Sequence, residues 1–401
     1  MPSLNLDKIN QYLPIPLEAR RLLALPEKSI TLNLNFHAAD GSLIIGQVYV
    51  VYYNTCRGPA KGGIRFSPHV SLDETCLLAE LMVWKTALTG IPFGGGKSGI
   101  CIDPKKISRQ EKISALKEFV HVMHDDLQYG RYIPAPDMGT SESDMAVIFG
   151  ETHVAESVTG KPVRIGGLPG RREATGRGVA TSMRLAAEQL LDSKPDGLAV
   201  AIQGFGNVGS WTAHFARQMG MKVVAVSDVA GGLYSSEGLP IAELMDWQNQ
   251  GKMLKDFAGP ETISNRDLLA LDVDILVPAA CEDQITVQVA EKVSARVIVE
   301  AANAPTTAEA DAVLQARRIP LVPDILANSG GVIASYVEWH KAKSGSLTDI
   351  RETYATIEEL ICRTFQSVHR VAKQHDVPLR MAAHILAVDE VVQAMRARGW
   401  I

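Results

Sequence analysis

Three lysines early in the chain stand in surroundings that are unusual for surface cations. Lys61 is followed by two glycines, Lys85 lies inside an apolar stretch, and Lys97 follows three consecutive glycines. Glycines let a ligand approach the backbone and the ammonium groups closely, and a lysine in an apolar helix is rarely buried without a partner. Each lysine alone is typical of a surface residue. The three together predict a site for an anionic ligand.

One carboxylate stands in a similarly special segment. Asp137 directly follows Pro134-Ala135-Pro136, which two prolines stiffen. A carboxylate held beside the lysines is suited to proton transfer. The alternative is a loop aspartate that caps the following helix.

A glycine motif at Gly204, Gly206 and Gly209 predicts a dinucleotide site. It follows the apolar run 198–203, opens a helical stretch, and precedes Asp228 by the spacing that a βαβ unit requires. The first glycine permits the tight turn, the second admits a pyrophosphate, and the third lets helix and strand pack closely. The helix N-terminus attracts the phosphate charge.

The acidic residue after the second strand bears on the choice of cofactor. Asp228 can accept hydrogen bonds from ribose hydroxyls and would repel a 2′-phosphate. Val229 and Ala230 follow it, so no adjacent cation receives that phosphate. NAD is therefore favoured, and NADP remains possible if a distant loop supplies a basic residue.

Hydrophobic patterns divide the chain into two α/β parts. Residues 30–53 alternate around Asp40-Gly41 like two strands with a tight turn, and 73–89 and 108–128 are helical. From about residue 175 short apolar runs alternate with helices, which predicts a parallel sheet covered on both faces. The apolar runs are 198–203, 222–228, 273–279, 296–301 and 319–322.

Composition limits the class of protein. The 401 residues suit two domains. A net charge of −5 argues against nucleic acid or an anionic membrane as partner. The five cysteines include no CxxC pair, so neither a disulfide framework nor a metal site is expected. No apolar run approaches the roughly 20 residues of a membrane helix, and the N-terminus lacks a signal-peptide core, so a cytoplasmic protein is expected.

Eight motifs together resemble the glutamate/leucine/phenylalanine/valine dehydrogenase family, from about residue 30 to the C-terminus. These motifs are GPAKGGIRF (58–66), WKTAL (84–88), IPFGGGKSG (91–99), PAPDMGT (134–140), GRREATGRGV (170–179), QGFGNVGS (203–210), EAANAPTT (300–307) and ILANSGGVIASYVEW (325–339).

The resemblance implies a role for each matched residue of the substrate site. Lys97 and Asp137 correspond to the catalytic lysine and aspartate, and Lys85 to the lysine that holds the substrate α-carboxylate. Lys61 and Ser335 match the pair that holds the γ-carboxylate of glutamate. Two further positions would line the same pocket, namely Ala135 and Val332.

The resemblance also implies the cofactor positions, with Asn303 and Asn328 near the nicotinamide end. The full expected set is Thr175, Gly204, Phe205, Gly206, Asn207, Val208, Gly209, Asp228, Ala279, Asn303 and Asn328.

The fold implied is a mixed-sheet substrate-binding and oligomerisation domain at 1–173, rejoined by a C-terminal helix at 376–401, and a Rossmann-like NAD(P)-binding domain at 174–375. The implied assembly is a homo-hexamer. The implied reaction is reversible oxidative deamination of glutamate to 2-oxoglutarate and ammonia. For that reaction Lys97 must reach its neutral form, which burial and neighbouring cations favour.

Two alternative functions remain within this resemblance, and Lys61 distinguishes a glutamate dehydrogenase from the first of them. Relatives acting on leucine or phenylalanine carry an apolar or neutral residue at the position of Lys61, since an ammonium group buried against a hydrocarbon is costly. A branched-chain or aromatic amino-acid dehydrogenase is therefore disfavoured. A non-catalytic regulatory homologue would be expected to lose Lys97, Asp137 or the glycine motif, and all are present.

The chain departs from the usual family pattern at a few positions, none of which removes a side chain with an assigned role. The departures are Ser67, Ser98, Leu168-Pro169, Ala301 and Ala304.

Overall fold

A computed structural model describes residues 4–38, 40–347 and 349–401. Residues 1–3 of the predicted first domain lie outside it. The chain divides into two compact units. Of the described residues, the first unit comprises those of 4–171, 332–353 and 384–401, and the second comprises those of 172–331 and 354–383.

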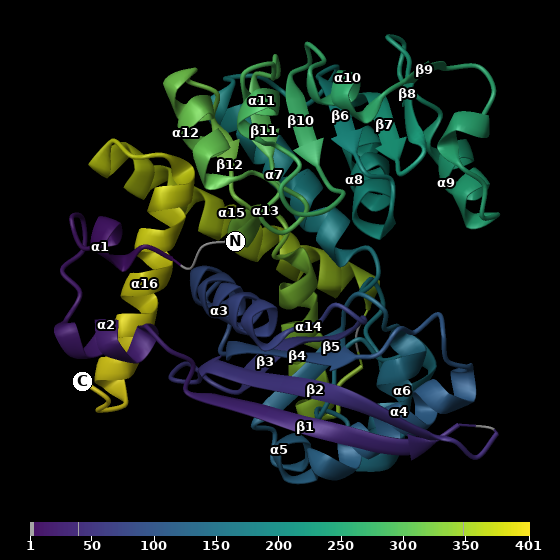
Figure 1. Ribbon diagram of the computed structural model, residues 1–401. Helices are drawn as coiled ribbons and strands as arrows, with labels where there is room; N and C mark the ends of the chain where they lie inside the picture. Colours follow the sequence, from purple (N-terminus) through teal and green to yellow (C-terminus); the bar gives the residue numbers. More distant parts are fainter. Residues whose placement is uncertain (1–3, 39, 348) are drawn as a thin grey trace. The chain divides into compact units, whose positions relative to one another are not determined.

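The first unit is built on a mixed sheet in the strand order β1-β2-β4-β3-β5. Its strands β1 and β2 form the antiparallel hairpin that the alternating pattern predicts, whereas β3 runs parallel to both β4 and β5. These strands are coloured purple to blue in Figure 1. Their bounds are β1 (Lys28–His37), β2 (Leu43–Asn54), β3 (Ala60–Phe66), β4 (Gly94–Cys101) and β5 (Tyr132–Pro136).

Six α-helices and one short 3₁₀ turn complete the amino-terminal part of this unit. The helix α4 begins at a capping box between Ser108 and Glu111, so Ser108 caps it as predicted. These elements are α1 (Leu6–Ile9), α2 (Leu17–Leu23), α3 (Leu72–Leu88), α4 (Arg109–Val122), α5 (His124–Gln128), α6 (Glu142–Thr152) and η1 (Val163–Ile165).

The second unit contains a seven-stranded sheet in the order β12-β11-β10-β6-β7-β8-β9. Its first five strands are parallel, but β8 and β9 continue the sheet antiparallel. The expectation of a wholly parallel sheet was therefore wrong at this edge, where a hairpin at Gly231 reverses the chain. The strands are β6 (Ala199–Gln203), β7 (Lys222–Asp228), β8 (Gly231–Tyr234), β9 (Glu261–Ile263), β10 (Ile275–Pro278), β11 (Val297–Val299) and β12 (Leu321–Val322).

Short helices connect these strands. They are α7 (Ala174–Leu190), α8 (Asn207–Gln218), α9 (Ile241–Asn249), η2 (Leu254–Asp256), α10 (Asn265–Leu269), α11 (Val287–Ala290), α12 (Ala308–Ala316) and α13 (Asp324–Ala327). Three further helices follow, and each has residues in both units: α14 (Gly330–Ser344), α15 (Ile350–His375) and α16 (Leu379–Ala397).

The units differ in three segments from the predicted domain division. Residues 332–353 belong to the first unit, and 172–173 and 376–383 belong to the second. Sequence patterns mark helices but not the neighbours they pack against, which explains why these tertiary assignments escape them.

None of the helices in the described residues combines the length and the apolar character that a membrane crossing needs. Within the same part of the chain, no three His, Cys, Asp or Glu side chains gather in a way that would hold a metal ion.

Candidate active site

The three lysines singled out by the sequence all lie in the first unit, and all are buried. Lys61 on β3 is 1% exposed, and Lys85 on α3 and Lys97 on β4 are each 6% exposed. Lys85 lowers the pKa of Lys97, and Lys97 lowers that of Lys61. The ammonium groups therefore lie close enough to repel one another, as a shared anion site requires.

Glycines let three strands approach closely around Lys97. The strand order places β3 between β4 and β5, and Asp137 immediately follows β5. A Cβ at Gly62 would come within 1.7 Å of the Gly96 carbonyl oxygen, and one at Gly63 within 2.7 Å of the Asp137 Cβ. Because these positions carry no side chain, Lys97 and Asp137 meet across β3.

The carboxylate of Asp137 is the centre of an ion-pair network. It accepts a hydrogen bond from the Lys97 ammonium group, and its Oδ1 lies 3.5 Å from Arg65 Nη2. Arg65 in turn pairs with Glu74 on α3. Sequence reasoning assigned no role to Arg65, although it belongs to the GPAKGGIRF motif, and it is a cation that faces the candidate catalytic pair.

Burial and neighbouring cations lower the pKa of Lys97 to about 7. Burial is the largest cause, and Arg65 and Lys85 add to it, whereas Glu74 opposes it. The direction is the one predicted from the sequence. A lysine with this pKa exists in both protonation states near neutral pH and can act as a base.

Lys61 is the more unusual of the buried cations. Its ammonium group donates a hydrogen bond to the Pro134 carbonyl oxygen over 3.5 Å, and among the described residues it forms no ion pair within 4 Å. Burial lowers its pKa well below the usual range, Arg171 lowers it further, and Glu338 opposes the change. A buried cation so weakly satisfied is stabilised when an anion binds beside it.

Glu338, the carboxylate that raises the pKa of Lys61, is already engaged in other hydrogen bonds. Glu338 on α14 accepts hydrogen bonds from the backbone N–H groups of Gly160 and Lys161 and from Lys161 Nζ at 2.8 Å. Both side chains of this ion pair are 1% exposed. Glu338 therefore anchors α14 to the loop at Gly160 and is not free to neutralise Lys61.

The expected pocket-lining residues lie in the same unit as the lysines and are buried. Ser335 stands three residues before Glu338, so both lie on one face of α14. The exposed fractions are 2% for Ser335, 9% for Val332 and 6% for Ala135.

The adjacent pair Arg171-Arg172 is a pattern typical of surface charge, but Arg171 is not an exposed cation. It is only partly exposed, its Nε is buried without a hydrogen-bond partner in the described structure, and burial lowers its pKa. Only Arg172 of the pair is exposed.

The departure at Ser98 has a structural explanation. Its side chain is fully buried, and its hydroxyl lies 2.8 Å from the hydroxyl of Tyr132 on β5. Tyr132 also donates to the Gly62 carbonyl oxygen over 3.4 Å. Ser98 thus adds a polar link across β3, next to Lys97.

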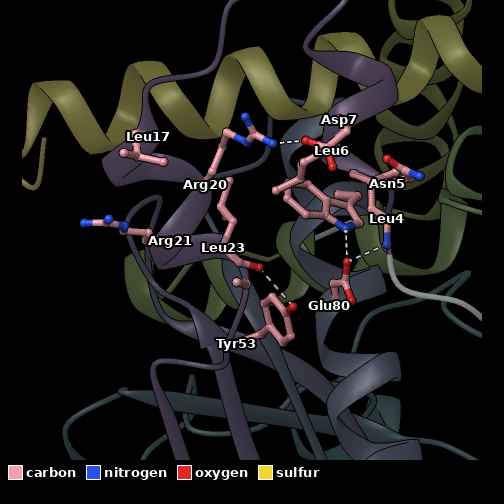
Figure 2. Close-up of a pocket in the computed structure, with 12 residues that line it drawn as sticks. Leu4, Asn5, Leu6, Asp7, Leu17, Arg20, Arg21, Leu23, Tyr53 and Glu80 are labelled. Atoms are coloured by element: carbon pink, nitrogen blue, oxygen red, sulfur yellow. Dashed lines mark hydrogen bonds and ion pairs between the residues drawn. The ribbon is translucent and has the colours of Figure 1, made fainter.

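Trp84 is a core residue, as expected. It is 2% exposed, and its Nε1 donates to Glu80 over 3.3 Å. Trp84 lines a cavity of about 630 Å³ together with residues of the amino-terminal segment. Figure 2 shows Glu80 and Tyr53 beside Leu4–Asp7 and Leu23 of that segment. Glu80 also accepts from the Leu4 backbone N–H, so this cavity is lined by the amino-terminal segment together with α3 and Tyr53 of β2.

In the second unit the glycine motif lies where a dinucleotide is expected. It follows β6, from which the chain continues to β7 on one side while β10 lies on the other, so the strand order reverses here. Gly204 has a φ of 94°, and a Cβ there would come within 2.8 Å of Ala280. Only glycine fits this turn comfortably.

The other two glycines meet opposite surroundings. A Cβ at Gly209 would lie 1.8 Å from the Gly204 carbonyl oxygen, whereas a Cβ at Gly206 would meet nothing within 4 Å. Gly209 lets α8 pack close to the sheet, and Gly206 leaves open space at the N-terminus of that helix. Gly206 has no side chain to cap α8, so the first amides of that helix suit a phosphate.

Asp228 lies at the end of β7 as the motif requires. Its carboxylate accepts hydrogen bonds from the backbone N–H groups of Ala230 and Leu254, at 2.7 and 2.8 Å. These bonds fix its orientation. Asn207, a further expected cofactor position, is exposed and donates to the Arg172 carbonyl oxygen.

Asn303 and Asn328 lie together. Asn328 Nδ2 lies 3.0 Å from Asn303 Oδ1 and donates to the carbonyl oxygens of Ala301 and Ala302, both at 3.2 Å. The remaining expected cofactor positions also belong to the second unit: Thr175 in the first turn of α7, the buried Phe205, Val208 in the first turn of α8, and Ala279 after β10.

A parallel sheet with a glycine turn at its switch point, in a chain whose other unit buries a lysine–aspartate pair, defines a dinucleotide-dependent oxidoreductase. The chain belongs to the glutamate/leucine/phenylalanine/valine dehydrogenase family. Residues 166–399 match the family description "Glutamate/Leucine/Phenylalanine/Valine dehydrogenase", and residues 26–154 match "Glu/Leu/Phe/Val dehydrogenase, dimerisation domain".

Characterised relatives match nearly the whole chain. A protein of Thermotoga maritima named "Glutamate dehydrogenase" is 42% identical over 94% of this chain and 92% of its own length. A "NADP-specific glutamate dehydrogenase" of Saccharolobus shibatae is 40% identical over 98% and 95%. The solved hetero-hexameric glutamate dehydrogenase of Thermus thermophilus, in its leucine-bound form, superposes with a TM-score of 0.92 at 33% identity, covering 98% of this chain and 95% of that chain.

The pKa of Lys97 can be tested by its reactivity with acetic anhydride, because only the neutral amine reacts. We expect a midpoint near pH 7 in the native protein, and one near 10.4 in the denatured protein. Replacing Arg65 by Gln removes a neighbouring positive charge, so the midpoint should rise. Peptide mass spectrometry of pulse-labelled samples measures both. A native midpoint near 10, or a fall in the Arg65→Gln variant, would contradict the assignment.

The open space beside Gly206 can be tested by filling it. Gly206→Ala should leave the thermal midpoint almost unchanged but weaken binding of NADH or NADPH by about tenfold or more, because the methyl group enters the phosphate space. Cofactor fluorescence measures the Kd. Gly150→Ala, where a Cβ also meets nothing, is the control and should bind normally. Equal binding by both variants would place the phosphate elsewhere.

Proposed function

We propose that this protein catalyses the reversible oxidative deamination of L-glutamate to 2-oxoglutarate and ammonia, with NAD or NADP as the hydride acceptor. The observation that carries the proposal is the buried ammonium group of Lys61, which forms no ion pair within the described structure. The distal carboxylate of glutamate would supply its countercharge through a charge-assisted hydrogen bond.

The chemistry of the pocket supports glutamate over the apolar substrates of the family. Placing an isobutyl or phenyl side chain against Lys61 would leave the cation buried and unpaired, at a cost of several kcal/mol. The names of the relatives agree, since those of T. maritima and S. shibatae are both glutamate dehydrogenases.

Each end of the substrate has a proposed partner. Lys85 would hold the α-carboxylate, and Lys61 with Ser335 would hold the distal one. The small side chain of Ala135 and the apolar side chain of Val332 would line the space between, which fits the methylene groups of glutamate.

The reacting centre would lie at Lys97 and Asp137. The bound cofactor supplies a nicotinamide that takes the α-hydride. Neutral Lys97 would then remove a proton from the water that adds to the imine carbon, and Asp137 would carry a proton to the departing nitrogen. Asp137 already accepts a hydrogen bond from Lys97, so the two groups are placed to exchange protons.

The residues of the second unit would hold the cofactor. The amides at the start of α8 suit the pyrophosphate, and Asp228 suits the ribose hydroxyls. Asn303 and Asn328 would lie near the nicotinamide end. We assign the first unit to the substrate and the second to the cofactor on this basis.

We also propose that six copies of this chain form a homo-hexamer. The match of residues 26–154 to a dimerisation domain supports self-association, and the Thermus thermophilus relative is a hexamer, in that case a hetero-hexamer. Sedimentation of the purified chain should give about six times the monomer mass. The cytoplasmic location expected from the sequence stays a prediction.

Initial-rate assays test the activity and the pocket together. The wild-type protein should reduce NAD or NADP with glutamate and much more slowly with leucine, valine or phenylalanine. Lys61→Leu should lower kcat/KM for glutamate by about 10- to 100-fold, the loss of one charge-assisted bond, and lower the preference for glutamate over leucine.

The matched control is Lys112→Leu. Lys112 is another largely buried lysine of the first unit, but it already pairs with Asp144 at 2.8 Å. Its replacement should reduce stability and leave the ratio of glutamate to leucine rates unchanged. Unaltered glutamate kinetics in Lys61→Leu would refute the pocket, and no glutamate-dependent reduction by the wild type would refute the function.

A further inference from the structure

The loop that follows β11 carries Asn303 and is fastened from one short helix. Asn328, at the end of α13, donates to the carbonyl oxygens of Ala301 and Ala302. At the start of α13, Asp324 Oδ2 accepts a hydrogen bond of 2.8 Å from the backbone N–H of Ala304. Residues at the two ends of α13 are thus hydrogen-bonded to the backbone on both sides of Asn303, at Ala302 and at Ala304.

Ala304 needs this fastening because its backbone conformation is an unfavourable one. Its φ is 41°, in the left-handed region that favours glycine. An alanine leaves this conformation readily unless other contacts fix it. The hydrogen bond to Asp324 is such a contact, and it acts on the residue next to Asn303.

Asp324 is itself held rigidly. It is 3% exposed, its backbone N–H donates to Glu300 Oε2 at 2.9 Å, and its Oδ1 accepts from the Ile325 N–H at 2.8 Å. Glu300 is fully buried and directly follows β11, where the loop begins. The carboxylate that fastens Ala304 is therefore tied to the strand from which the loop departs.

One arginine, Arg380, forms ion pairs with three carboxylates around the loop, those of Glu300, Asp311 and Asp324. Arg380 at the start of α16 lies 2.7 Å from Glu300, 3.7 Å from Asp324 and 3.1 Å from Asp311 on α12. Within the described structure, the Asp311 carboxylate pairs with the arginine and accepts no hydrogen bond from the loop, whereas the Asp324 carboxylate contacts both. Asp311 therefore only pairs with Arg380, whereas Asp324 also holds Ala304. Replacing one or the other separates the effect of the ion pair from the effect of the bond to Ala304.

We propose that Asp324 is a positioning residue for the nicotinamide end of the cofactor: by fixing the left-handed Ala304, it places Asn303. This inference rests on the proposed function, in which Asn303 and Asn328 lie near the nicotinamide. Asp324 acts through the loop and touches neither substrate nor reacting atoms.

The test compares Asp324→Asn with Asp311→Asn, two identical chemical changes beside the same arginine. In Asp324→Asn the amide oxygen has two donors to accept from, Arg380 and the Ile325 N–H, so the amide NH₂ is turned toward the Ala304 N–H. Two donors then face each other, and the bond to Ala304 is lost with little change in volume. Asp311→Asn weakens only the pairing with Arg380.

Three measurements report on the loop. Hydrogen–deuterium exchange of the peptide that contains Ala304 should rise at least tenfold in Asp324→Asn and stay near wild type in Asp311→Asn. The Kd for NADH or NADPH and the KM of the oxidised cofactor should rise about fivefold or more in the first variant only. Its kcat should also fall, while the KM for glutamate stays within twofold.

The outcomes separate this inference from the proposed function. If the wild type oxidises glutamate but Asp324→Asn matches it in exchange and in cofactor binding, the positioning role is wrong. If both variants lose cofactor affinity equally, the arginine cluster acts as a whole and the role of Asp324 is also refuted. If the wild type lacks glutamate activity, the proposed function fails, while the exchange experiment still shows whether Asp324 fixes the loop.

Discussion

The structure depends on the burial of one positive charge, that of Lys61, which forms no ion pair among the described residues. Lys61, Lys85 and Lys97 are removed from water close to one another. The nearby carboxylates are committed: Asp137 pairs with Lys97, and Glu338 pairs with Lys161. Burying an uncompensated cation is expensive, so a fold that keeps one has a ligand that repays the cost on binding.

The backbone provides this site by omitting side chains. Gly62 and Gly63 on β3 allow Lys97 and Asp137 to approach from the strands on either side, and Gly95 lets α3 pack against β4, since a Cβ there would come within 2.4 Å of the Ala79 carbonyl oxygen. Glycines have the same effect in the second unit, where Gly204 and Gly209 allow the tight turn between β6 and α8. The glycine motifs therefore define both sites as much as the charged residues do.

Much of this arrangement was accessible from the sequence. Period-two alternation predicted the β1–β2 hairpin, apolar runs predicted β6 and β7, and the motif spacing predicted the turn at Gly204.

The features that the sequence did not predict depend on tertiary neighbours. The three glycines before Lys97, Gly94–Gly96, carry no pattern typical of a strand, yet they are part of β4 because pairing with β2 and β3 holds them extended. The roles of Arg65, Arg171 and Asp324 depend in the same way on residues distant in sequence.

The most direct test of the central claim is an experimental structure with L-glutamate bound. The account predicts the distal carboxylate about 3 Å from Lys61 Nζ and the α-carboxylate at Lys85. A distal carboxylate held by other groups, or a Lys61 that pairs with Glu338 while glutamate is bound, would contradict it.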